Sequence, residues 1–495
     1  PPTIASPARG LTSASLPVQH PGAALRLAAA HLREACRQRA ALRVGVPPDS
    51  VLMAEGCFVA GTERLQYAEL FDAALLDEAV DPQHLARRDG RASAFGASPR
   101  TDISQKVFGE FEYLHDMRLP GMLWGRIFAP PTPLGRLEEA GWTELEPRLR
   151  GIAGVVEVVR DGQLVGVLAE AAHPLEACSK LVTRIAPWLG EVDVPKPADT
   201  ARWLRSRPLD TVTILDRQPA EAPAPATRIF QAEYGRGWLH HASIGLCCAI
   251  AQWEQHATGE TLQVWSHTQG IFNLRRDLAL AFGIEEASVR VCHADAAGCY
   301  GHNGADDVAF DAAWLARHAQ GRPVRLEWTR GQEMTRSPMA AAKTVEIEAG
   351  VDERGRITRW RQSIFSQGHG TRPGRGATPA LTGAWQTAQP TPVTMAINMP
   401  PPTGGGARRN GVAPYAFDSV QVHSHRVLAM PLRVSAMRAL GAHVNVMAAE
   451  SMMDEIARAL GQDPLAFRLA HLDDPRGRAV LEEAARLCEA AGPRP

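Results

Sequence analysis

The sequence predicts an α/β fold with mixed sheets, and two features of the chain lead to this expectation. First, a strand, a glycine-containing turn and a helix follow one another twice within residues 262–316. Second, alternating apolar segments joined by short turns, at residues 155–168 and 344–365, have the pattern of antiparallel hairpins. Strand–helix units favour parallel pairing and hairpins are antiparallel, so both kinds of pairing are expected.

Length and composition restrict the class of protein. A chain of 495 residues exceeds one ordinary hydrophobic core, so two or three domains are expected. The formal net charge of −1 removes the electrostatic case for nucleic-acid binding. No apolar run has transmembrane length, and no signal-peptide pattern is found. The eight cysteines form no C-x-x-C motif, which favours reduced thiols over a zinc or iron–sulfur site.

Four segments are expected along the chain, residues 1–95, 96–190, 191–226 and 227–495. The third combines proline, alanine and charge, which predicts a linker with one short helix. Within the fourth, residues 368–411 are rich in glycine and proline and lack periodicity, so we expect a lid or an interdomain contact there. The expected helices are residues 23–42, 174–188 and 444–460, and the expected strands or hairpins are residues 51–69, 111–113, 122–128, 228–234 and 420–427.

The clearest candidate for a binding loop is residues 298–304, which read GCYGHNG. Glycine at every third position allows positive φ and close approach of backbone N–H groups to a ligand. A helix predicted from Asp306 or Asp307 would offer its positive end to an anion, and both aspartates fit N-cap positions. The spacing is not G-x-G-x-x-G and no lysine follows a glycine, which excludes a Walker A loop. The pattern alone leaves a phosphate-bearing cofactor and a tight structural turn as alternatives.

Three histidine-containing pairs have the residue types of metal ligands. They are His240 with His241, His423 with His425, and His115 with Asp116. Each pair also fits an ordinary polar position, on a half-exposed strand face or at the end of a strand. We expect all three pairs to be polar residues of this kind and not metal ligands.

Five passages of the chain resemble the molybdenum-cofactor-binding subunit of the xanthine dehydrogenase / aldehyde oxidase family, in the branch of bacterial nicotinate dehydrogenase, isoquinoline oxidoreductase and aldehyde dehydrogenase large subunits. They occur in the family's order. The resemblance implies a molybdopterin-binding domain at residues 227–495, an inserted α/β hammerhead domain at 96–190, and an N-terminal piece of the cofactor region at 1–95. The passages are LPGMLWGRIFAPP (119–131), HTQGIFNLRRDLA (267–279), GCYGHNGADDVAFDAAWLAR (298–317), RPVRLEWTRGQEM (322–334) and PLRVSAMRALGAHVNVMAAESMMDEIARALGQDP (431–464).

The resemblance also implies a cofactor and the residues around it. The cofactor would be molybdenum–molybdopterin, as the cytosine dinucleotide in the bacterial branch, with no direct protein ligand to the metal. Gln269 would hydrogen-bond its oxo ligand, and Arg438 would position cofactor or substrate, although a structural ion pair is the alternative for Arg438. These two are the implied catalytic residues. The residues expected at the cofactor are Gln269, Gly270, Gly298, Cys299, Tyr300, Gly301, His302, Gly304, Arg438, Ala439 and Gly441.

The implied reaction places a water-derived hydroxyl on an aldehyde carbon or on a ring carbon next to nitrogen. Two electrons would then pass to a small 2Fe-2S subunit, and in this branch a cytochrome c subunit often follows. The resemblance implies a cytoplasmic protein that its partners can bring to the membrane or the periplasmic face.

The chain departs from the family pattern in one important respect. The family's base is a glutamate in a G-x-G-E segment, whereas the glutamates that follow glycine here are Glu110, Glu191 and Glu260, outside the matching region. We therefore expect a chain incomplete at both ends, with the second cofactor domain supplied by another chain. The alternatives are an inactive truncated or assembly protein of the same fold, and a shared fold whose glycine loop binds a different anion. Tyr300 replaces the family's usual phenylalanine, which leaves the substrate open.

Overall fold

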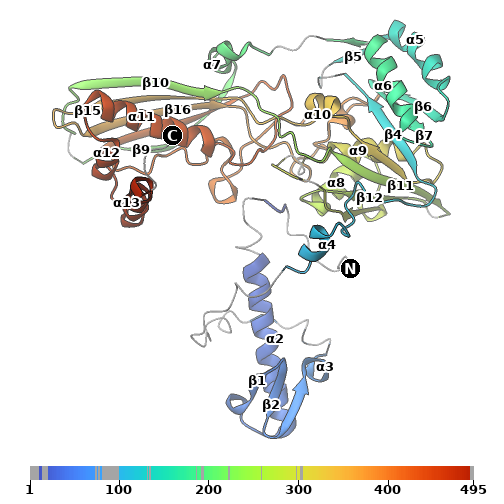
Figure 1. Ribbon diagram of the computed structural model, residues 1–495, viewed down its shortest axis with the longest axis horizontal. Helices are drawn as coiled ribbons and strands as arrows, with labels where there is room; N and C mark the ends of the chain where they lie inside the picture. Colours follow the sequence, from blue (N-terminus) through green and yellow to red (C-terminus); the bar gives the residue numbers. More distant parts are fainter. Residues whose placement is uncertain are drawn as a thin grey trace. The chain divides into compact units, whose positions relative to one another are not determined.

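The computed structural model describes residues 11–13, 21–72, 75, 79–80, 100–130, 132, 135–185, 187–190, 194–220, 223–257, 259–296, 298–301 and 305–490 (Figure 1). The chain divides into two compact units. One contains Thr12–Phe111 and the other contains Glu112–Pro495.

The smaller unit consists of a long helix and a small sheet. Helix α2 (Pro21–Val44) confirms the helix predicted at residues 23–42. The predicted hairpin is an antiparallel sheet of three strands, β1 (Leu52–Ala54), β2 (Cys57–Ala60) and β3 (Glu63–Gln66). Gly61 makes the turn between the last two with φ 62°. Phe58 and Leu65 from the sheet and Cys36 from α2 are buried together. The unit also contains the short helices α3 (Tyr67–Leu70) and α4 (Ile103–Val107).

A seven-stranded mixed sheet forms one half of the larger unit. Its strand order is β13-β12-β11-β14-β4-β7-β6. The pairs β12/β13 and β14/β4 are parallel and the others are antiparallel, so the predicted mixed pairing is confirmed. The bounds are β4 (Leu123–Phe128), β6 (Val155–Asp161), β7 (Leu164–Ala169), β11 (Cys248–His256), β12 (Gly259–Ser266), β13 (Val289–His293) and β14 (Val324–Glu327).

Strands from the segment predicted as a hammerhead domain are hydrogen-bonded into this same sheet. Leu123 of β4 lies in parallel register with Val324 of β14. Helices α5 (Glu139–Arg150) and α6 (His173–Ile185) pack on β4, β6 and β7 and bury a core of their own, which includes Leu145 and Cys178. The small strands β5 (Arg136–Leu137) and β8 (Trp188–Leu189) pair beside them. A strand at residues 111–113 does not form, because Asp116 accepts the Tyr113 N–H in a turn.

Helix α9 (Asp307–Ala316) lies at the centre of this half and is buried on every side. Its start confirms the helix predicted from Asp306 or Asp307. Gly125 and Gly166 in the sheet below it leave room for Leu315, because a Cβ on Gly166 would lie 2.4 Å from Leu315 Cδ2. Helix α8 (Ile271–Phe282) packs beside β13, and the short helix α10 (Arg330–Arg336) follows β14.

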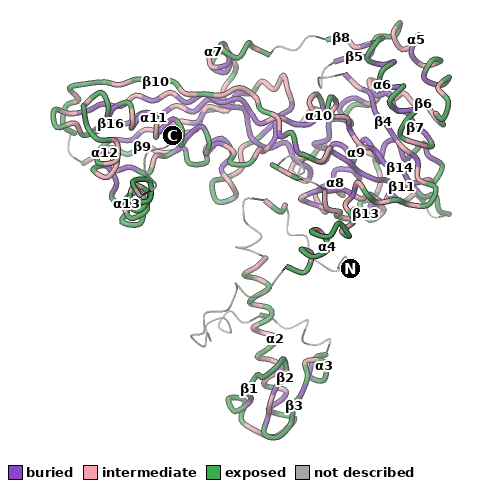
Figure 2. The backbone as a smooth tube through the Cα atoms, viewed as in Figure 1, coloured by how far each residue is buried: buried purple, intermediate pink, exposed green. Residues whose placement is uncertain are grey.

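The other half of the larger unit is a five-stranded sheet with the order β10-β15-β16-β17-β9. Helix α11 (Ala442–Ala459) packs on β10 and β15, and helices α12 (Pro464–Ala470) and α13 (Pro475–Ala490) follow it. The strands run buried through the middle of the sheet (Figure 2). The bounds are β9 (Leu209–Arg217), β10 (Arg228–Arg236), β15 (Lys343–Val351), β16 (Ile357–Ser366) and β17 (Ser419–Val427).

Two sequence predictions for this half need correction. The predicted linker at residues 191–226 does contain the short helix α7 (Thr200–Arg205), but it also contains strand β9, which pairs with β17. The β-branched run around Val212 and Ile214 forms this strand despite the proline-rich surroundings. Residues 368–386 are mostly buried, so they form part of the core and not an exposed lid. Across the described residues, no helix combines the length and apolarity needed to cross a bilayer.

Packing of this buried segment on α9 can be tested with one glycine. A Cβ at Gly383 would lie 2.2 Å from the Phe310 ring. We expect Gly383→Ala to lower the free energy of unfolding by about 1–3 kcal/mol, as overpacking of a core does. Gly237→Ala is the matched control, because nothing lies within 4 Å of its Cβ position. Denaturant unfolding of both variants measures the difference, and equal stability would show that the segment is not packed as described.

Candidate functional site

The first bend of the candidate site joins β12 to α8 and carries Gln269. The side chain of Thr268 shapes this bend, because its hydroxyl accepts the Gly270 N–H at 3.0 Å. The same hydroxyl donates to Asp306 Oδ2 at 2.6 Å. Gln269, half-buried, therefore stands immediately before the first turn of α8, at the end of the helix that carries partial positive charge.

The second bend contains Gly298, Cys299, Tyr300 and Gly301. Both glycines have positive φ, 105° and 113°, as expected for a glycine-rich loop. A Cβ on Gly301 would lie 2.4 Å from Ala436 O, so no larger residue fits where this bend meets the chain before Arg438. Tyr300 O accepts the Arg438 N–H at 2.7 Å. His302 and Gly304, also predicted at the site, lie outside the described residues.

The third bend is the Arg438–Gly441 turn before α11. Ala439 and Leu440 are consecutive non-glycine residues in the left-handed region, with φ 76° and 52°. Such backbone costs about 1–3 kcal/mol per residue and persists only where the surroundings hold it. Two contacts hold it here, since Gly441 N–H donates to Gly406 O at 3.1 Å and the buried Lys343 Nζ donates to Gly441 O at 3.1 Å. Among the described residues no carboxylate pairs with Arg438, so the structure does not support the ion-pair alternative.

Arg372 connects the second bend to the residues behind the first. Its Nη2 donates to Gly301 O at 2.7 Å, and it interacts electrostatically with Asp306 and with Cys299. Burial, together with the neighbouring Arg375, lowers the pKa of Arg372 to about 10. Within the described parts of the chain neither arginine has a carboxylate at ion-pair distance. The Asp306 carboxyl that interacts with Arg372 is itself favoured as the neutral acid, and a buried cation without a full counter-charge is costly in a protein interior, so this lining fits an anionic group.

The two aspartates at the start of α9 do not cap the helix with their side chains, which corrects the N-cap prediction. Asp306, in the left-handed region with φ 59°, accepts from Thr268 instead. Asp307 forms an ion pair with Arg433 and accepts the Thr382 N–H at 2.7 Å. Burial raises the pKa of the Asp306 carboxyl well above its ordinary value, so the protonated acid is favoured. Both carboxyl groups thus hold neighbouring segments in place beside the bends.

Two of the three histidine pairs, His240/His241 and His423/His425, make hydrogen bonds within the protein, whereas His115 lies close to Cys248 and Glu327 and not in a pair with Asp116, which accepts the Tyr113 N–H. His241 Nε2 bonds to Ala436 O at 3.0 Å, and burial lowers the His241 pKa to about 4, which keeps the ring neutral. On β17, His425 and His423 form hydrogen bonds with Thr211 and Thr213 of β9. Among the described residues, neither pair belongs to a group of three or more candidate metal ligands.

Sequence reasoning missed Arg372 and Arg375. They lie in the passage TRPGRG within residues 368–411, where the lack of periodicity predicted a lid or an interdomain contact. The pattern that could have indicated these two residues is the alternation of arginine with glycine and proline. Turns of the backbone at glycine can bring charged side chains close to a ligand.

Comparison with known proteins identifies the family. Residues 210–385 and 398–472, about half of the chain and including all three bends, match the family model described as the molybdopterin cofactor-binding domain. The chain belongs to this family. The predicted family and fold class are therefore confirmed, and the chain is part of a family of molybdopterin-binding oxidoreductases.

Relatives extend the comparison beyond the matched domain. The chain is 34% identical to one of the subunits of nicotinate dehydrogenase from Pseudomonas putida, over 98% of this chain and 40% of the relative. It is 25% identical to the beta subunit of isoquinoline 1-oxidoreductase from Brevundimonas diminuta, over 94% of this chain and 62% of the relative. The chain thus spans about half the length of these relatives.

Solved structures show the same fold at low sequence identity. Quinoline 2-oxidoreductase from Pseudomonas putida 86 superposes with a TM-score of 0.56 at 18% identity, over 77% of this chain and 50% of that one. Aldehyde oxidoreductase from Desulfovibrio gigas gives 0.56 at 15% identity, over 76% and 43%.

The protonated state of Asp306 can be tested by its effect on stability. Its raised pKa means that the folded protein keeps a proton that the unfolded chain loses above about pH 4. Wild-type stability should therefore fall as pH rises through the folded pKa. Asp306→Asn cannot titrate, so we expect its stability relative to wild type to improve between pH 4 and 8, by about 1.4 kcal/mol for each unit by which the pKa is raised.

Denaturant unfolding at several pH values measures this difference. Asp473→Asn, at an exposed position, is the control for the loss of one carboxyl group. A variant at Asp306 that loses stability equally at every pH would mean that the wild-type carboxyl is ionised in the fold.

Proposed function

We propose that this chain is the cofactor-binding part of a molybdenum hydroxylase large subunit, which oxidises an aldehyde or an N-heteroaromatic compound with oxygen derived from water. The observation that carries the proposal is a set of contacts that join the second bend to the third and tie the first bend to the start of α9. Tyr300 bonds to Arg438, Gly301 to Arg372, and Thr268 of the Gln269 bend to Asp306. The three bends belong to three of the five passages that resemble the family. Backbone and side-chain contacts between these three passages support the proposal.

The residues present fit an anionic pterin cofactor. When bound, the molybdenum–pterin supplies oxygen transfer to carbon and accepts the two electrons. Gln269 would offer its amide to the cofactor as a hydrogen-bond donor, and the Gly298 position leaves room for no more than a Cβ, which would contact Ser243 Cβ at 3.6 Å. Arg372 and Arg375 balance negative charge, and Arg438 supplies a forked donor for a carboxylate or a cofactor oxygen.

The substrate class and partners follow from the relatives and remain part of the proposal. Their names refer to nicotinate, isoquinoline and quinoline, all N-heteroaromatic compounds. Several are named as subunits, which supports an assembly. We propose that electrons leave to a small 2Fe-2S subunit and onward to a cytochrome c subunit, that the cofactor is the cytosine dinucleotide, and that the assembly is cytoplasmic or reaches the membrane or periplasmic face through its partners.

No G-x-G-E segment occurs in these 495 residues, so the general base of the proposed reaction would come from a segment outside them, in the same polypeptide or in another. Without such a segment the alternative applies, an assembly protein of the same fold that holds cofactor without turnover. Metal and pterin analysis of the chain, purified together with its neighbouring gene products, decides between them. Molybdenum with a cytosine nucleotide and turnover supports the hydroxylase. Cofactor without turnover supports the assembly protein, and a folded complex with neither metal nor pterin rejects both.

Charge balance predicts the effect of removing Arg372. We expect Arg372→Gln to reduce bound molybdenum and pterin per chain by about tenfold or more, because a charge-assisted contact in a buried site is worth about 1.5–3 kcal/mol. Elemental analysis and pterin fluorescence measure the content. The exposed Arg361→Gln on β16 is the control and should retain full cofactor. Full occupancy in Arg372→Gln would remove Arg372 from the site.

Gln269 gives a separate test of the chemistry. We expect Gln269→Ala in the complete assembly to abolish turnover while the thermal unfolding midpoint stays within a few degrees, since the side chain is half-buried before α8. Gln263→Ala, on the preceding strand, should retain turnover. Unchanged activity in Gln269→Ala would exclude this residue from the reaction.

A further inference from the structure

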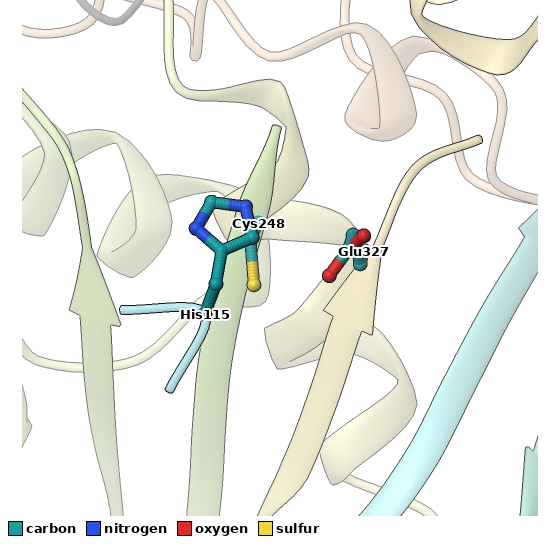
Figure 3. Close-up of side chains that lie close together, drawn as sticks. All are labelled: His115, Cys248 and Glu327. Carbon is teal, nitrogen blue, oxygen red and sulfur yellow. The ribbon is translucent and has the colours of Figure 1, made fainter. Parts of the chain in front are cut away.

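A second group of ligand-type side chains lies on the seven-stranded sheet, apart from the three bends. It consists of His115, Cys248 and Glu327, whose ligand atoms all lie within 4.8 Å of one another (Figure 3). Cys248 begins β11 and Glu327 ends β14, while His115 belongs to the loop before β4. The three residues are far apart in the sequence, so spacing along the chain could not show the group.

Strand register and loop anchoring bring the three side chains together. Cys248 and Glu327 are directly opposite each other in the antiparallel pair β11/β14. The His115 loop is held by its neighbour, because the fully buried Leu114 donates its N–H to Asp295 O at 2.8 Å. His115 itself is oriented by a bond of 2.9 Å between Nε2 and Leu246 O. The group is therefore held by the sheet and does not depend on mobile side chains.

We propose that His115, Cys248 and Glu327 bind a divalent cation of the zinc class. An imidazole nitrogen, a thiolate and a carboxylate oxygen are the three ligand types that zinc takes in proteins, and water can supply the fourth position. In Figure 3 the ring nitrogen on the side of Glu327 is Nε2, so an ion bound through this nitrogen would replace its hydrogen bond to Leu246 O. The site would join the His115 loop to two strands of the sheet.

Arg325 is the main competitor for this cation. Its Nη2 donates to Glu327 Oε2 at 3.0 Å, the guanidinium also interacts with the Cys248 thiol, and it lies over the Trp124 ring. A carboxylate has two oxygens, so Glu327 can keep this hydrogen bond and bind the ion with the other oxygen. The guanidinium charge nevertheless opposes a second cation, so the site should bind more weakly than a closed four-cysteine zinc site. Saturating metal should still raise the thermal unfolding midpoint, since it binds the folded state only.

Cobalt(II) is the probe for the experiment, because a cobalt–thiolate bond gives a near-ultraviolet charge-transfer band. The full chain, with reduced thiols, is titrated with cobalt(II) and then with zinc(II). We expect one cobalt per chain with the thiolate band, displacement by zinc, and loss of the band in Cys248→Ser. The control is Cys247→Ser, since this adjacent thiol is equally buried but bonds to Glu333 instead. It should keep the band.

Three results would overturn the proposal. They are a wild-type chain without the band, a band that persists in Cys248→Ser, and a band that Cys247→Ser abolishes as well. If Cys248→Ser does not fold, the half-exposed His115→Ala decides the matter, because the proposal requires at least about tenfold weaker cobalt binding in that variant. Unchanged binding in His115→Ala rejects the site.

Discussion

The structure of the larger unit depends on the burial of helix α9. A helix that is covered on every side must find partners for each polar group it carries into the interior. Asp306, just before the helix, accepts from Thr268, Asp307 pairs with Arg433, and Asp311 pairs with Arg336 at 3.1 Å. These partners belong to the Gln269 bend, to the approach of the Arg438 bend, and to α10. The requirement that buried carboxyl groups be satisfied therefore organises the segments that surround the candidate site.

Positive charge is the second organising feature. Arg372, Arg375 and Lys343 are all largely buried, and among the described residues none has a carboxylate partner at ion-pair distance. Lys343 Nζ donates to two carbonyl oxygens, Ala407 O at 2.8 Å and Gly441 O. Burial lowers the pKa of Lys343 well below its ordinary value, and a neutral amine can still donate both hydrogen bonds. An arginine loses its proton far less readily. The two arginines therefore fit a bound anion, whereas the lysine has a role in holding two loops together.

Local patterns in the sequence predicted several helices and hairpins. The helix at residues 23–42, the hairpin at 155–168 and the helix start at Asp307 followed from the spacing of apolar residues and from turn and helix-start residues, although α9 and β7 are buried at every position and not on one face only. Strand β9 was missed because its partner β17 is about 200 residues away, and only that pairing makes the run around Val212 a strand. The predicted N-cap roles of Asp306 and Asp307 were wrong for the same reason. Their carboxyl groups bond to Thr268 and Arg433, which are distant in the sequence, and not to backbone N–H groups of the first turn of α9. The family resemblance predicted the residues of the bends. That Arg372 is buried and has no carboxylate at ion-pair distance among the described residues could be learned only from the structure.

The parallel register of β4 with β14 has a consequence for biosynthesis. The two strands are separated by about 200 residues, yet β4 is an interior strand of the seven-stranded sheet. During translation, the hairpin partner β7 emerges soon after β4, whereas the opposite edge of β4 stays unpaired until the ribosome has passed Glu327. Exposed strand edges of nascent chains are sites of aggregation. This sheet therefore places a demand on chaperones for the time needed to synthesise the whole intervening segment.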